Sequence, residues 1–133
     1  MKFLDSTCLL RFPIVVTLLA HSLLSLFTGG VNDFVYYYLN EVGFAPLGVP
    51  LAWAIKLSHV AAAMCFLFNR YLKLAGWISI FIFTMGIIML HAAEGWFVVG
   101  AGHKGMEFNF LLILVILYLM YPRLSFTKEL KGI

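Results

Sequence analysis

Charged residues are scarce in this sequence. Lysine and arginine together number 9 and aspartate and glutamate 6, so that 11% of the 133 residues are charged while 63% are hydrophobic. An ordinary soluble domain has about 25% charged residues, and a small fold leaves much of its surface in water. The composition therefore excludes a soluble globular domain and predicts a protein that folds in a lipid bilayer.

Cysteine is also rare, with single residues at Cys8 and Cys65. Without a Cys-x-x-Cys pair, the sequence offers no disulfide framework, no dithiol redox motif and no covalent haem attachment. The net charge of +3 comes without a cluster of basic residues, so we expect no nucleic-acid partner.

Long apolar runs take the place of the missing charges. A membrane-spanning helix needs about 20 mostly apolar residues, and an isolated strand in lipid would leave its backbone polar groups unpaired. The sequence therefore predicts helices over residues 9–28, 47–68, 73–94 and 106–122. The fold class that we expect is all-α: an antiparallel four-helix integral membrane bundle that forms one domain over residues 1–133.

The first apolar run has features of a retained helix. Arg11 interrupts it near its start, and no small-residue cleavage site is followed by a polar mature region. We therefore expect residues 9–28 to remain as a membrane span instead of being removed as a signal peptide.

An amphipathic helix is predicted over residues 32–42, between the first two spans. Glycines bound this segment on both sides, and its apolar residues recur at helical spacing: Val31, Val35, Tyr38 and Val42. The tyrosines at positions 36–38 are typical of the membrane headgroup level, so we expect this helix to lie in the interface. It is either a lid over a cavity between the spans or a plain connector.

The distribution of basic residues predicts the orientation. They lie before or within the start of the first span, between the second and third, and after the fourth: Lys2, Arg11, Arg70, Lys73, Arg123, Lys128 and Lys131. The other two connections carry mainly acids: Asp33, Glu41, Glu94 and Glu107, with Lys104 as the strong base. By the positive-inside rule, both termini are cytoplasmic, and we expect a bacterial cytoplasmic membrane.

Polar residues inside the apolar spans form stripes at helical spacing. Such residues are costly in lipid and usually face the interior of a bundle. The stripes of the first three spans are Thr17, His21, Ser25 and Thr28; Ala52, Lys56, His59 and Ala63; and Thr84, Ile87, His91 and Glu94. The fourth is Glu107, Leu111, Leu114, Tyr118 and Tyr121. We expect the first three stripes to pack inward.

The depths of these residues predict a polar cavity in the outer half of the bundle. At 1.5 Å per residue, His21 lies roughly 10 Å, Lys56 roughly 13 Å and His59 roughly 18 Å below the outer surface. The predicted ligand-binding residues, rim included, are His21, Lys56, His59, His91, Glu94, Glu107 and Asn109. The sequence assigns no catalytic residue.

Lys56 is the most informative of these residues, because a lone ammonium at this depth must lose its proton or meet an anion. Glu94 and Glu107 are the expected partners if the lysine holds a structural ion pair. The alternative is that Lys56, with a histidine, contacts an anionic or carbonyl-bearing ligand.

The histidines fit two cofactors. Imidazole can exchange protons with a quinone, or it can ligate haem b. Haem between His21 and His59 would have to be tilted, because their depths differ by about 8 Å. We expect no metal site, since the remaining combination of His91, Glu94, Glu107 and His103 consists mostly of hard ligands in an exposed loop.

Three stretches resemble the DoxX family of small four-helix membrane proteins over roughly residues 9–126. They are "LLRFPIVVTLLAHSLLSLF", "VGFAPLGVPLAWAIKLSHVAAAMCFLFNRYLKLAGW" and "GHKGMEFNFLLILVILYLMYPRLSF". The matching residues at the start of the last helix are Gly102 or Gly105, followed by Glu107, Phe108 and Asn109. Lys56 departs from the pattern, because the family commonly has a glutamate there, so a role of that carboxylate does not carry over.

The resemblance implies a membrane redox context. The family takes its name from association with thiosulfate:quinone oxidoreductase, whereas relatives on the same scaffold are thought to act as chaperones or cargo receptors. The leading hypothesis is an accessory subunit of a redox system that binds a quinone or another lipophilic ligand. Its partners would be the bilayer and other redox subunits or further copies of the chain. The competing hypothesis is a non-enzymatic scaffold or assembly factor.

Overall fold

The computed structural model describes residue 5, residues 7–99 and residues 105–122, and within these ranges the chain contains helices and no strand. Three helical segments are long and apolar enough to cross a membrane: Cys8–Thr28, Gly48–Leu67 and Leu72–Glu94. These bounds agree closely with the predicted spans and confirm the all-α class. The fourth apolar helix has 14 residues and is shorter than predicted. Some residues of the orientation and metal arguments lie outside the described ranges: Lys2, His103, Lys104, Arg123, Lys128 and Lys131.

The helices follow one another with few connecting residues. In chain order they are α1 (Cys8–Thr28), α2 (Gly30–Phe34), η1 (Val35–Leu39), α3 (Gly48–Leu67), α4 (Leu72–Gly86), η2 (Ile87–His91), η3 (Ala92–Glu94) and α5 (Glu107–Met120). The segments η1 and η2 are π-helical, and η3 is a 3₁₀ turn. Together α4, η2 and η3 form the third segment that is long and apolar enough to cross a membrane.

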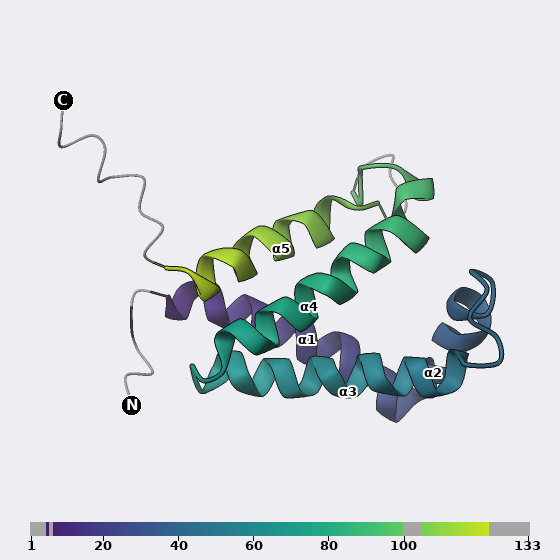
Figure 1. The fold of residues 1–133 in the computed structure, drawn as a ribbon, viewed down its shortest axis with the longest axis horizontal. Helices are drawn as coiled ribbons and strands as arrows, with labels where there is room; N and C mark the ends of the chain where they lie inside the picture. The colour runs from purple at the N-terminus through teal and green to yellow at the C-terminus, as the bar shows by residue number, and fades with distance from the viewer. Residues whose placement is uncertain (1–4, 6, 100–104, 123–133) are drawn as a thin grey trace.

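The four long helices α1, α3, α4 and α5 run in alternating directions along the long axis of the molecule (Figure 1). α1 packs on α3, α3 on α4, α4 on α5, and α5 returns to α1. We call the end with residues 68–71, between α3 and α4, the turn end. The opposite end, with α2, η1, η2 and η3, is the loop end. Figure 1 shows that α3 and α4 lie close together at the turn end and diverge toward the loop end.

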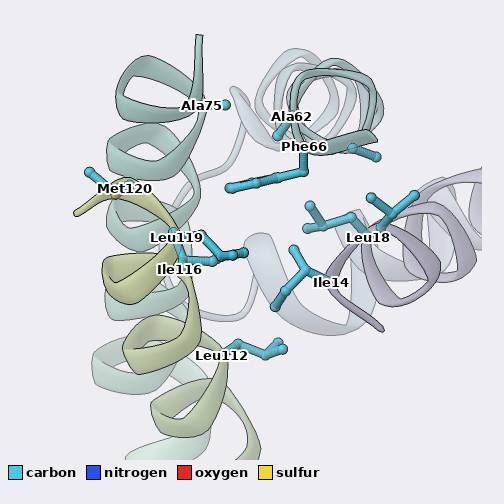
Figure 2. Packing of buried hydrophobic residues seen from close by; sticks show 11 residues of the cluster. Ile14, Leu18, Ala62, Phe66, Ala75, Leu112, Ile116, Leu119 and Met120 are labelled. Atoms are coloured by element: carbon cyan, nitrogen blue, oxygen red, sulfur yellow. The ribbon is translucent and has the colours of Figure 1, made fainter. Parts of the chain in front are cut away.

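The main hydrophobic core occupies the half of the molecule near the turn end. Figure 2 shows Phe66 of α3 pointing between side chains of α1 and α5, among them Ile14, Leu18 and Leu119. Phe66 and Ile116 are fully buried. In lipid the gain comes from close contact between side chains, because lipid tails are as apolar as the core.

Small residues bring α4 and α5 together in this core. A Cβ added to Gly76 would overlap the Met120 side chain and would lie 3.2 Å from Cγ2 of Ile116. A side chain at position 76 would therefore have to displace the Met120 side chain, and small residues are common where membrane helices pack closely.

Arg11 is buried and ties the start of α1 to the end of α3. Its guanidinium donates to the carbonyl oxygens of Phe66 at 3.3 Å and Leu67 at 3.5 Å, which belong to the last turn of α3. It also donates to the Thr7 hydroxyl at 3.1 Å and pairs with Asp5 at 3.0 Å. The hydrogen bond from Thr7, followed by that from Arg11, lowers the pKa of Asp5. The guanidinium thus supplies donors to carbonyls that a helix end leaves unpaired.

The segment after α1 folds back over α3. It begins at Gly30, two residues before the predicted start. Val31, Val35 and Leu39 are buried together with Ala52 of α3. Tyr36 and Tyr37 point outward and are exposed, as expected for rings at a membrane surface.

Candidate functional site

A cavity of about 640 Å³ lies between the helices in the half of the molecule near the loop end. Binding pockets for small molecules typically measure about 300–1,000 Å³. α1, α3, α4, η2 and α5 contribute to its wall, and the segment after α1 covers it. The wall is mainly apolar, with a few polar side chains: Thr17, His21, Lys56, Ser58, His59, His91 and Asn109. The cavity lies toward the loop end, where α3 and α4 diverge (Figure 1).

The α3 stripe faces inward, as predicted. Ala52 and Ala63 are completely buried, and Lys56 and His59 are 9% and 7% exposed. Lys56 and His59 lie on the wall of the cavity. The prediction holds on α3 because neither an ammonium group nor an imidazole can satisfy itself on its own helix and remain in contact with lipid.

The Lys56 ammonium is bound by neutral groups. Nζ donates to the backbone carbonyl oxygen of His21 at 3.1 Å and lies 5.0 Å from the centre of the Phe34 ring. Among the described residues, no carboxylate lies within ion-pair distance of Nζ. The expected pairing with Glu94 or Glu107 is therefore wrong. An ammonium has three donors, and the contact to His21 uses one of them.

His59 is buried without hydrogen-bond partners. Its ring packs on Phe83, with 5.6 Å between the ring centres. Neither Nδ1 nor Nε2 has a partner among the described residues. Such a group is costly, because a buried polar atom without a hydrogen bond loses about 1–3 kcal/mol. An orphaned imidazole in a cavity wall is what a site for a hydrogen-bonding ligand would contain.

His21 lies at the edge of the cavity, and the predicted α1 stripe is displaced. The inward residues of α1 are Arg11, Ile14, Val15, Leu18 and Ser22, whereas His21 and Thr28 are exposed. The hydroxyls of Ser25 and Thr28 donate to carbonyl oxygens of their own helix at 2.9 and 2.6 Å. Because Ser and Thr can satisfy themselves in this way, they do not need to face the interior.

The predicted stripe on α4 and the segments after it is inward only in part, because His91 is half-buried and lines the cavity. Thr84 and Glu94 are exposed, while Ala75, Gly76 and Ser79 are buried. The prediction assumed α-helical periodicity through residue 94. The π-helical segment η2 bonds residue i to i+5 and so rotates the residues beyond Ile87, Glu94 among them, relative to an α-helix. Thr84 lies before this segment, within α4.

His91 and Asn109 both lie beside Gly86. An added Cβ on Gly86 would lie 3.5 Å from Nδ2 of Asn109 and 3.9 Å from Cδ2 of His91. Both side chains line the cavity. They form a second polar position on the α4 and α5 side, whereas Lys56 and His59 belong to α3.

The two glutamates of the predicted rim lie away from this cavity's wall. Oε1 of Glu107 accepts the backbone N–H of Val98 at 2.8 Å. Glu94 instead lines a second cavity, of about 580 Å³, together with Asp33, Tyr37, Tyr38 and His91. The structure therefore brings His21, Lys56, His59, His91 and Asn109 around one cavity and leaves Glu94 and Glu107 outside it.

The sequence interpretation missed the aromatic residues around the cavity. Phe34 and Phe44 line its cover, and Phe83 supports His59. Phe34 lies two residues before Tyr36, within the segment predicted as an interfacial helix. Nothing in the pattern singled out Phe83.

The chemistry of the cavity is that of a site for an apolar molecule with hydrogen-bond acceptors. Lys56 is a donor, and the imidazoles and the Asn109 amide can donate as well. Among the described residues, which exclude His103, no three His, Cys, Asp or Glu side chains are grouped to hold a metal ion. No family model matches the chain, and no curated protein or solved structure matches it.

Proposed function

We propose that this protein binds a lipophilic quinone in the cavity between α1, α3, α4 and α5, as an accessory subunit of a membrane redox system. The observation that carries the proposal is the combination of an apolar cavity with donors at two positions. Lys56 and the orphaned His59 are at one of them, and His91 and Asn109 are at the other. A 1,4-quinone has carbonyl oxygens at opposite ends of its ring, so each position would bind one oxygen.

The membrane setting of the proposal is an antiparallel four-helix bundle with its loop end on the outer side. Arg70 and Lys73 at the turn end support a cytoplasmic position for that end. Membership of the DoxX family and a bacterial cytoplasmic membrane belong to the same proposal.

The test is quinone binding by the purified protein. Lipid extracts of the wild-type protein should contain quinone, and the protein stripped of lipid should bind an added short-tail ubiquinone analogue. Lys56→Met and Asn109→Leu should each weaken this binding by about tenfold, or about 1.4 kcal/mol.

Lys73→Met is the matched control for this test. Lys73 lies at the turn end with Nζ 5.2 Å from the centre of the Tyr121 ring, and it is not part of the cavity wall. This variant should bind the analogue as the wild type does. A wild-type protein that binds no quinone, or equal binding by all variants, would refute the proposal.

The contact between Lys56 and the His21 carbonyl oxygen favours a second candidate function, a non-enzymatic scaffold or assembly factor. In that case the polar residues of α3 serve to hold α3 against α1. Deletion of the chain would then lower the amount of an assembled membrane complex, and Lys56→Met would have the same effect without any bound quinone in the wild type.

Haem b is the remaining alternative, with His59 as an axial ligand. It predicts a Soret absorption band in protein purified from haem-replete cells and the loss of that band in His59→Ala. A colourless wild-type preparation would exclude it.

A further inference from the structure

The cavity reaches the outside of the molecule between α3 and α4. Ile78 and Phe81 line it, yet they are 41% and 66% exposed on the surface of α4. On α3, the exposed Ala54 and the half-buried Ser58 line the facing edge. Side chains that border both the cavity and the exterior mark an opening, and it lies where the two helices diverge (Figure 1).

Apolar side chains form the floor and the cover of the cavity, and its border toward the loop end is polar. Leu18 and Leu112, which belong to the main core, form its floor. Phe34, Leu39 and Phe44 lie in its cover. Toward the loop end, the cavity borders the second cavity through shared residues such as His91, and there the wall includes the carboxylates of Asp33 and Glu94. An apolar chain would lose free energy against those carboxylates.

The surface around the opening is apolar. Trp53 and Leu57 of α3 and Trp77 of α4 are exposed beside it. These helices belong to segments long and apolar enough to span a membrane, so in a bilayer the opening faces lipid tails. A hydrocarbon chain can pass from the bilayer into the cavity without crossing a polar surface.

We infer that the ligand enters sideways from the bilayer through the gap between α3 and α4, and that its long apolar tail stays in this gap while its head group lies at Lys56 and His59. The inference rests on the proposed function and narrows the ligand to a quinone with a long isoprenoid tail. The short-tailed analogue would fill the head-group site alone.

The test fills the gap without changing the head-group site. Ala54→Trp places a large side chain at the opening, and Ala61→Trp is its control. Ala61 is an exposed alanine two turns further along α3 that does not line the cavity. Binding of a short-tailed and a long-tailed ubiquinone is measured for each variant in lipid nanodiscs.

The expected result is selective. Ala54→Trp should weaken binding of the long-tailed quinone by about tenfold or more and change binding of the short-tailed analogue little, and Ala61→Trp should change neither. Ile78→Trp, on the opposite side of the gap, should repeat the selective loss and serves if Ala54→Trp does not fold. Equal loss of both quinones, or no loss of either, overturns the tail position. If the wild type binds neither quinone, the proposed function fails as well.

Discussion

Replacing Lys56 by methionine tests whether the lysine supports the fold or the ligand. Methionine has a similar length and is flexible enough to fill the same space. The change removes the hydrogen bond to the His21 carbonyl oxygen and the contact with the Phe34 ring. Hydrogen bonds to charged groups contribute about 1.5–3 kcal/mol, and a cation on a ring contributes about 0.5–2 kcal/mol.

The same change also removes the cost of burying an ammonium group. This cost is roughly several kcal/mol for an ion in a protein interior, and Lys56 is 9% exposed without a carboxylate partner among the described residues. The free energy gained by removing the buried charge nearly cancels the free energy lost with the hydrogen bond and the ring contact. We therefore expect the free energy of unfolding of Lys56→Met to lie within about 2 kcal/mol of the wild-type value. We expect its affinity for quinone to be about tenfold lower.

The assay combines thermal unfolding in detergent micelles with binding of the short-tailed quinone. Lys73→Met controls for the general effect of losing a lysine. A large fall in melting temperature that Glu94→Gln or Glu107→Gln restores would show a carboxylate acting on Lys56 and would refute this reasoning. Retained quinone binding in Lys56→Met would contradict the ligand role independently.

Three further predictions concern the fold and its orientation. Arg11→Met should lower the free energy of unfolding by about 2–4 kcal/mol, because carbonyls at the end of α3 lose a charged donor, whereas Asp5→Asn should lower it by less than about 1 kcal/mol. Thermal unfolding of both variants measures which change destabilises more, and a larger effect of Asp5→Asn would contradict the role of the guanidinium. Gly76→Leu should destabilise by about 1–3 kcal/mol through overpacking against α5, and an unchanged melting temperature would show that the helices can separate freely. In a variant without native cysteines, a cysteine at Glu41 should react with impermeant maleimide added outside the cell and one at Arg70 should not; the opposite labelling would invert the proposed orientation.

The long helices could be predicted from the sequence because few physical constraints determine them. A bilayer requires about 20 apolar residues for each helix, and the three longest runs end at glycines, at a basic turn or at polar residues. The same reasoning overestimated the length of α5, which ends at Met120. Apolar composition predicts where in the sequence a helix can form, but it does not predict at which residue the helix ends.

The inward faces were predictable only where a side chain depends on other helices. Lys56 and His59 require an interior position, and the α3 stripe was correct. The Ser25 hydroxyl donates to a carbonyl oxygen of its own helix. The spacing of the polar residues on α1 therefore did not indicate which side of the helix faces the interior. The rotation after Ile87 comes from a π-helical turn, which a search for α-helical periodicity misses.

The partner of Lys56 was not predictable, because backbone groups leave no mark in a sequence pattern. The sequence offered Glu94 and Glu107 as the acids at a suitable depth. In the fold, Glu107 accepts a backbone N–H, and a backbone carbonyl oxygen takes its place beside Lys56. Every residue contains such a carbonyl, so its availability depends on the packing of α1 against α3.

The main-chain acceptor at His21 limits what alanine scanning can detect. The carbonyl oxygen that receives Lys56 Nζ also receives the hydroxyl of Ser25, and it stays in place whatever side chain occupies position 21. A phenotype of His21→Ala would therefore report on the imidazole at the edge of the cavity. Alanine scanning at position 21 would not detect the hydrogen bond between Lys56 and the main chain of α1. Genetic data that find the His21 side chain dispensable would therefore not show that this hydrogen bond is dispensable.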